Sequence, residues 1–135
     1  MNTIKTNNYI KQIEAVLDAI GCELEAVEVV PNIHDWCVEH NIEESNFFRA
    51  GKCLRNKETG KHLILLAEEI KKETILSITA AMEIKGLFKK TESLNSSWDF
   101  LKHLLLHEIA HSVHPEFSEL ECDTWAFEQI DKLAM

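Results

Sequence analysis

The segment LLHEIAHSVH, from Leu105 to His114, places three histidines and one glutamate in an otherwise aliphatic stretch. On a helix, His107 and His111 are four residues apart, so their rings lie one turn apart on the same side. Both imidazoles can then reach one metal ion at about 2.0–2.1 Å each. Glu108 lies on the flank, near such an ion but outside its ligands. This HExxH arrangement supplies two metal ligands and a general base. The alternative is a helix with a surface stripe of histidines, and a third protein ligand is needed to decide between them.

His114 is excluded as that third ligand by its distance from His107. It follows His107 by seven residues, which is about 10 Å along a helix axis and too far for both rings to share one ion. Pro115 also disfavours a helical conformation at His114. We therefore expect His114 at the end of the helix, either facing its negative dipole end or lining a cleft.

The following helix offers better ligands. Ser118 and Glu121 form a capping-box pattern that starts a helix and occupies Glu121 at its N-terminus. Glu119 and Asp123 are then aligned on one face of this helix. Glu121 points roughly 200° away from Glu119, so only one of these two glutamates can face the metal ion. We expect Glu119 to complete the metal site and Asp123 to accept the second ring N–H of a ligand histidine. Glu116, in the turn, is a weaker choice for the third ligand.

Two blocks of residues near the C-terminus form a composite motif: His107-Glu108-x-x-His111 and Glu119-x-x-Cys122-Asp123-x-Trp125-Ala126. In these blocks the chain resembles the gluzincin group of zincin metallopeptidases, and more narrowly the ImmA/IrrE-like family. Cys122 and Trp125 stand where that family's motif has Ala and Phe or Tyr. The resemblance implies a single zincin-like domain over residues 1–135, a small cytosolic zinc peptidase. It also implies His107, His111 and Glu119 as zinc ligands and Glu108 as the base. Several members of the family cleave helix-turn-helix regulators, which implies a protein or peptide substrate.

Composition and charge narrow the classes of partner that this protein can bind. With 23 acidic against 14 basic residues and a net charge of −9, the chain lacks the clustered cations that nucleic acids and anionic membranes require. It has no uninterrupted apolar run approaching ~18 residues, and its N-terminus lacks an apolar signal core. We expect a cytoplasmic protein. Its four cysteines, none in a CxxC pair, are then buried thiols rather than disulfides.

The periodicity of apolar residues predicts an α+β fold. We expect a short antiparallel sheet of two or three strands packed on four or five helices, the active-site helix being followed by the helix that bears the third ligand. The expected elements are a helix closed by Gly21, a strand over 23–30, a short helix capped by Asn32, a hairpin joining 46–54 to 62–67, helical structure over 68–90 with TILSIT (74–79) as a possible strand, and two final helices over 97–113 and 118–134.

A hydrolase of this kind binds Zn²⁺ through three side chains and uses a water molecule that the metal activates, with Glu108 as general base. His103, His114 and Tyr9 are the candidates for stabilising the oxyanion. The segment HLILL (62–66) is expected as an edge strand that binds substrate backbone. The alternative is a catalytically silent zincin-fold interaction module, in which a structural zinc staples the domain and the acidic surface binds a regulatory protein. Glu108 favours the hydrolase, because a structural site needs no base.

Overall fold

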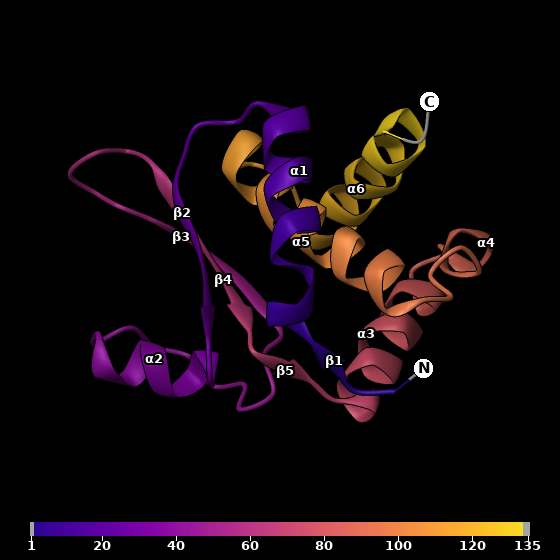
Figure 1. The fold of residues 1–135 in the computed structure, drawn as a ribbon, viewed down its shortest axis with the longest axis horizontal. Coiled ribbons are helices and arrows are strands. Elements are labelled where there is room, and N and C mark those ends of the chain that lie inside the picture. Colours follow the sequence, from indigo (N-terminus) through magenta and orange to yellow (C-terminus); the bar gives the residue numbers. More distant parts are fainter. Residues whose placement is uncertain (1, 134–135) are drawn as a thin grey trace.

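The computed structural model describes residues 2–133 and places α-helices around a small sheet (Figure 1). The strands are β1 (Ile4–Lys5), β2 (Leu24–Val30), β3 (Gly51–Arg55), β4 (His62–Ala67) and β5 (Glu69–Ile70). The helices are η1, a 3₁₀ turn (Thr6–Tyr9), α1 (Ile10–Ile20), α2 (Ile33–Glu39), α3 (Lys72–Ile84), α4 (Phe88–Thr91), α5 (Ser97–Val113) and α6 (Glu119–Leu133). The predicted α+β class is confirmed.

The main sheet is mixed, with strand order β2-β4-β3. β4 pairs antiparallel with β3, as the predicted hairpin requires, but parallel with β2. The expectation of an antiparallel sheet is therefore wrong for the β2–β4 pair. The chain passes through α2 and β3 between these strands, and this long connection lets β4 run in the same direction as β2. A second, two-stranded sheet pairs β1 antiparallel with β5.

The expectation that HLILL is an edge strand is also wrong. β4 is the central strand of the main sheet, with β2 on one side and β3 on the other. Its residues Ile64, Leu65 and Leu66 are fully buried, so both faces of the strand are covered. Its backbone hydrogen-bonding groups are taken up by its neighbours, and β3 is the edge strand beside α5 instead.

Most of the predicted helices and their caps are present. α1 ends at Gly21, whose φ of 69° is the left-handed conformation that glycine adopts most easily. The Asn32 side chain accepts a hydrogen bond from the Asp35 backbone N–H at 2.9 Å and starts α2. The 74–79 segment belongs to helix α3, because Ile75, Ile78 and Met82 recur at helical spacing and pack inward. The predicted end of the last helix, at residue 134, lies outside the described residues.

Helix α5 is the centre of the core. It has the bounds predicted from the sequence, and the Ser96 hydroxyl accepts a hydrogen bond from the Asp99 N–H at its start. Leu101, Leu105, Leu106 and Ile109 have no exposed surface, and burial of each such side chain contributes about 1.5–3 kcal/mol. Figure 1 shows α5 between the sheet and α6, so packing fixes one face of α5 and turns its histidines toward α6.

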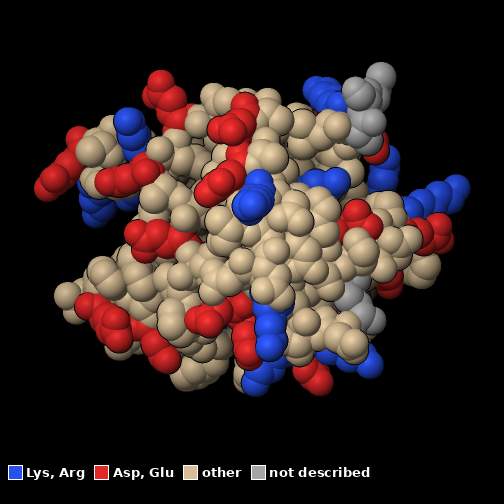
Figure 2. Space-filling model, viewed as in Figure 1, with Lys and Arg blue, Asp and Glu red and all other residues tan. Residues whose placement is uncertain are grey.

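The cysteines were expected to be thiols rather than disulfides. Over residues 2–133 all four cysteines carry free thiols, and Cys37 and Cys122 are buried. No helix in this part of the chain has both the length and the apolar character needed to cross a bilayer. In Figure 2 the acidic and basic side chains are interspersed over the visible face rather than gathered in one patch.

Candidate metal centre and the adjoining cavity

The three residues predicted as metal ligands come together between α5 and α6. Glu119 Oε2 lies 2.6 Å from His107 Nε2, and Glu119 Oε1 lies 3.3 Å from His111 Nε2. The two imidazole rings are 5.0 Å apart between centroids. One carboxylate from the start of α6 thus faces the Nε2 atoms of both histidines on α5.

Asp123, one turn after Glu119, orients His107 from the other side of its ring. Its Oδ1 lies 2.7 Å from His107 Nδ1 and 3.0 Å from His103 Nε2. One carboxylate oxygen therefore accepts hydrogen bonds from two rings. Burial raises the pKa of Asp123, but these bonds outweigh it and lower the pKa to about 2. The predicted contact between Asp123 and a ligand histidine is present.

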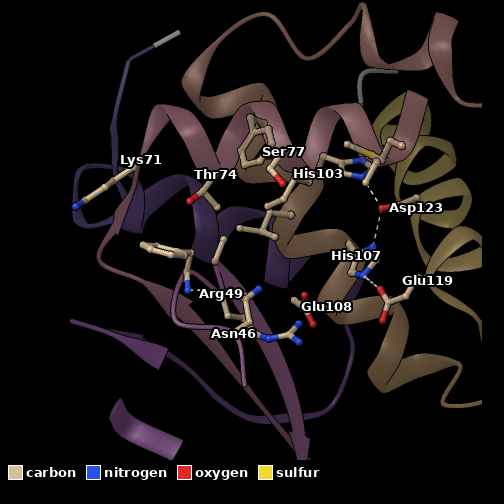
Figure 3. A pocket seen from close by; sticks show the side chains of 18 of the residues that line it. Asn46, Arg49, Lys71, Thr74, Ser77, His103, His107, Glu108, Glu119 and Asp123 are labelled. Carbon is tan, nitrogen blue, oxygen red and sulfur yellow. Dashed lines mark hydrogen bonds and ion pairs between the residues drawn. The ribbon is translucent and has the colours of Figure 1, made fainter. Parts of the chain in front are cut away.

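His107 is clamped between two carboxylates, Asp123 at Nδ1 and Glu119 at Nε2 (Figure 3). Burial lowers its pKa, but the bonds to the two carboxylates outweigh this and raise it to about 10. A neutral imidazole that donates Nδ1–H to Asp123 would present its Nε2 lone pair to the negative Glu119 oxygen. At 2.6 Å that contact needs a proton between the two atoms, and a metal cation bound by both atoms could take the place of that proton. This donor set therefore fits a divalent cation.

His111 has a different neighbour at its Nδ1 atom. The Cys122 thiol lies there, with Sγ 3.5 Å from the nitrogen. Burial and the surrounding carboxylates, Glu119 first among them, raise the pKa of Cys122 to about 12. The thiol thus stays protonated at neutral pH, and a thiolate is the form that binds metal. Without a bound metal ion, Cys122 therefore contacts His111 as a thiol, and a metal ion at this place would deprotonate it.

Two sets of three side chains among the described residues bring ligand atoms within 4.8 Å of one another, and each set could hold a metal ion. One is His107, His111 and Cys122, and the other is His103, His107 and Asp123. Both sets share His107. With Glu119, whose side chain is 59% exposed, they form one continuous cluster of imidazoles, carboxylates and a thiol. N and O donors of this kind suit zinc and other divalent transition metals.

Glu108 faces a cavity beside this cluster. The cavity has a volume of about 550 Å³ and lies between α3, α5 and the 46–51 segment, with His107, Glu108, Glu119 and Asp123 on its wall (Figure 3). Burial raises the pKa of Glu108, while the charges of His107 and His111 act in the opposite direction. A buried carboxyl with a raised pKa next to a candidate metal centre is suited to accepting and returning a proton.

Gly51, at the start of β3, lets the backbone approach Glu108 closely. A Cβ atom at this position would lie 3.2 Å from Cγ and Oε2 of Glu108 and 3.2 Å from Cδ1 of Leu104. The absence of a side chain therefore makes room for the Glu108 carboxylate. An isolated glycine inside a strand pattern is a sequence signal for such a close approach.

The other residues considered from the sequence lie elsewhere. Glu121 completes the predicted capping box: Ser118 N–H donates to Glu121 Oε1 at 3.0 Å, and Glu121 N–H donates to Ser118 Oγ at 3.2 Å. His114 is at the end of α5, stacked on Phe117 and 3.5 Å from Glu116. His114, Glu116 and Glu121 do not line the cavity.

Sequence reasoning gave no role in the site to Arg49, Gly51 or Cys122. Arg49 and Gly51 lie on the cavity wall, and Cys122 contacts His111. Arg49 carried no local signal, because it is more than fifty residues before the HExxH motif in the sequence. It comes close to that motif only because β3, which follows it, pairs with the central strand.

Comparisons of this chain with protein-family profiles, with curated proteins and with solved structures found no match. The function proposed below is therefore argued from the geometry of the site.

Proposed function

We propose that this protein is a zinc-dependent peptidase that hydrolyses peptide bonds of a protein substrate, with His107, His111 and Glu119 as metal ligands and Glu108 as general base. One observation carries the proposal: a buried carboxyl, Glu108, faces a cavity of about 550 Å³ directly beside the His107–His111–Glu119 cluster. A cluster that only held the fold together would need neither the base nor the open volume.

The donor chemistry supports a metal at the cluster. Two Nε2 atoms and one carboxylate are the three protein ligands typical of catalytic zinc, which keeps a fourth position open. When bound, zinc would polarise the peptide carbonyl and lower the pKa of water. Asp123 would keep His107 in the Nδ1–H tautomer, so that its Nε2 lone pair points to the ion.

Glu108 would carry the proton through the reaction. It accepts a proton from water as the water oxygen bonds to the carbonyl carbon and the carbonyl π electrons move to the oxygen. It then donates the proton to the amide nitrogen as the C–N bond breaks, which releases the amine.

The substrate backbone would lie along β3. This strand has β4 on one side only within the described residues and packs beside α5. Its free edge can pair with an extended peptide, and Gly51 at its start is next to Glu108. The substrate-binding role that was expected for HLILL (62–66) is thus proposed for β3 instead.

Comparison of wild type with Glu108→Gln in the native host tests this function against a silent interaction module. The Gln variant keeps the side-chain shape but removes its basicity. A peptidase produces a protein fragment in the wild-type proteome that is missing with Glu108→Gln. An interaction module has the same cellular effect in both strains and produces no fragment, and that result would refute the proposal.

A further inference from the structure

We propose that Arg49 is a catalytic residue of this site: its guanidinium donates hydrogen bonds to the carbonyl oxygen of the scissile bond as negative charge develops there. This inference rests on the proposed peptidase function and deepens it. It supplies the oxyanion-stabilising group that the three residues considered from the sequence do not provide.

A buried carboxylate holds Arg49 in place. Arg49 Nε lies 2.9 Å from Glu44 Oε1, and the Glu44 side chain is only 3% exposed. Glu44 is itself fixed by an ion pair with Lys52 and by a hydrogen bond from the Asn46 backbone N–H at 3.2 Å. The Nε atom is buried and faces Glu44 as an ion pair, although the contact does not have the geometry of a hydrogen bond.

The other end of the guanidinium is available. Within residues 2–133, the one ion pair of Arg49 is formed through Nε, which leaves the donors of the two Nη groups for another partner, because an arginine carries five N–H donors. Arg49 lines the cavity together with Glu108, and both lie in the same part of it in Figure 3. Gly51, two residues along the chain, packs against the Glu108 side chain. A fixed cation with free donors thus borders the place where the reacting carbonyl would lie.

The other candidates for stabilising the oxyanion are not placed to contact the scissile carbonyl. His103 is 2% exposed and gives its Nε2 to Asp123, while its ring packs on Phe127. Tyr9 stacks on Trp98 and, like His114, does not line the cavity.

The chemistry matches a fixed arginine. When the water oxygen bonds to the carbonyl carbon, the carbonyl π electrons become a full negative charge on oxygen. A preorganised donor aimed at that oxygen stabilises the transition state more than the neutral amide, because its position costs no reorganisation during the reaction. Glu44 provides that preorganisation, and the planar guanidinium offers several N–H donors to one oxygen.

Binding of two small ligands to the zinc-loaded protein tests the proposal without a known substrate. The first is a dipeptide phosphonate, in which a tetrahedral anionic phosphorus group replaces the scissile carbonyl. The second is acetohydroxamate, which occupies the metal only. Affinities are measured by calorimetry for wild type, Arg49→Met, Arg49→Lys and the control Arg55→Met, which removes the arginine at the far end of β3, the strand that follows Arg49.

We expect Arg49→Met to weaken phosphonate binding by about 10- to 100-fold and to leave acetohydroxamate binding unchanged. Arg49→Lys should recover part of the loss, and Arg55→Met should bind both ligands like wild type. Unchanged phosphonate binding in a folded Arg49→Met protein would overturn the role of Arg49 alone. Loss of both ligands in Arg49→Met would also overturn it, since that result indicates a damaged metal site. Wild type that binds neither ligand would overturn the peptidase proposal and this inference with it.

Discussion

Glu119→Ala and Glu121→Ala form a matched pair that tests the assignment of the third ligand. Both remove a carboxylate from the first turn of α6, and the two residues are only two positions apart. Glu119 faces the Nε2 atoms of His107 and His111 at 2.6 and 3.3 Å, whereas Glu121 caps the helix through Ser118. We expect Glu119→Ala to weaken zinc binding by at least ~100-fold, since loss of even an outer-shell partner costs about 10–100-fold. Glu121→Ala should cost about 1 kcal/mol of stability at unchanged zinc affinity.

In thermal unfolding, this difference in zinc affinity is measured as a difference in the zinc-dependent rise of Tm. Free zinc at 100 times its Kd stabilises the folded protein by about 2.7 kcal/mol, which for a domain of this size raises Tm by roughly 10 °C. At the same zinc concentration, a 100-fold weaker site gains only about 0.4 kcal/mol, or roughly 1–2 °C.

The assay is a melting curve with and without zinc for both variants, with zinc affinity measured against a chromophoric chelator. Equal loss of the zinc-dependent shift in both variants, or loss only in Glu121→Ala, would show that the wrong face of α6 has been assigned to the metal.

Three further predictions follow from the contacts around the site. Asp123→Asn should lower zinc affinity by about 10–100-fold in the same chelator competition, because the amide cannot hold His107 in the required tautomer as the carboxylate does. Glu44→Gln should destabilise the fold at pH 7: burial raises the Glu44 pKa, but Lys52 and Arg49 lower it from 4.5 to about 2. Such a shift corresponds to ~3 kcal/mol, reduced to about 2 kcal/mol by solvent screening of Arg49. Since the folded-state pKa is depressed, this stability is present above pH 4.5 and is lost as the pH falls toward 2. Urea unfolding should therefore show a smaller difference in stability between wild type and Glu44→Gln at pH 3 than at pH 7. Gly51→Ala should change Tm little, because the lost backbone freedom of the unfolded chain offsets the crowding. It should still cut turnover of a zinc-loaded protein on a peptide mixture at least ~10-fold by displacing Glu108.

The helices were predictable because their signals are local. Ser96 and Asp99 fix the start of α5, and the capping box of Ser118 and Glu121 starts α6. The direction of β2 was not predictable in this way, because alternation of side chains is the same in parallel and antiparallel strands. The continuous apolar run of β4, buried on both faces, was a usable sign of a central strand and argued against an edge.

The grouping of side chains in the candidate metal centre was predictable for the same reason as the helices. His107, His111, Glu119 and Asp123 lie on two consecutive helices, and the i, i+4 rule aligns each pair. Gly51 starts β3 and Arg49 lies just before it, far from α5 in the sequence, and only the tertiary structure brings them to the cavity with Glu108. Sequence periodicity contains no information about contacts between residues so far apart in the sequence. The cavity wall formed by α5 and α6 could therefore be predicted, and the opposite wall could not.

The most direct test of the central claim is the rate of peptide-bond cleavage by purified wild type and Glu108→Gln at equal zinc content, on a mixture of peptides read by mass spectrometry. We expect wild type to cleave and Glu108→Gln to retain zinc, fold and Tm while losing turnover by ~10²–10⁴-fold, the contribution typical of a positioned base. Equal cleavage by both proteins, or no cleavage by a fully zinc-loaded wild type, would contradict the assignment of Glu108 as the base of a peptidase.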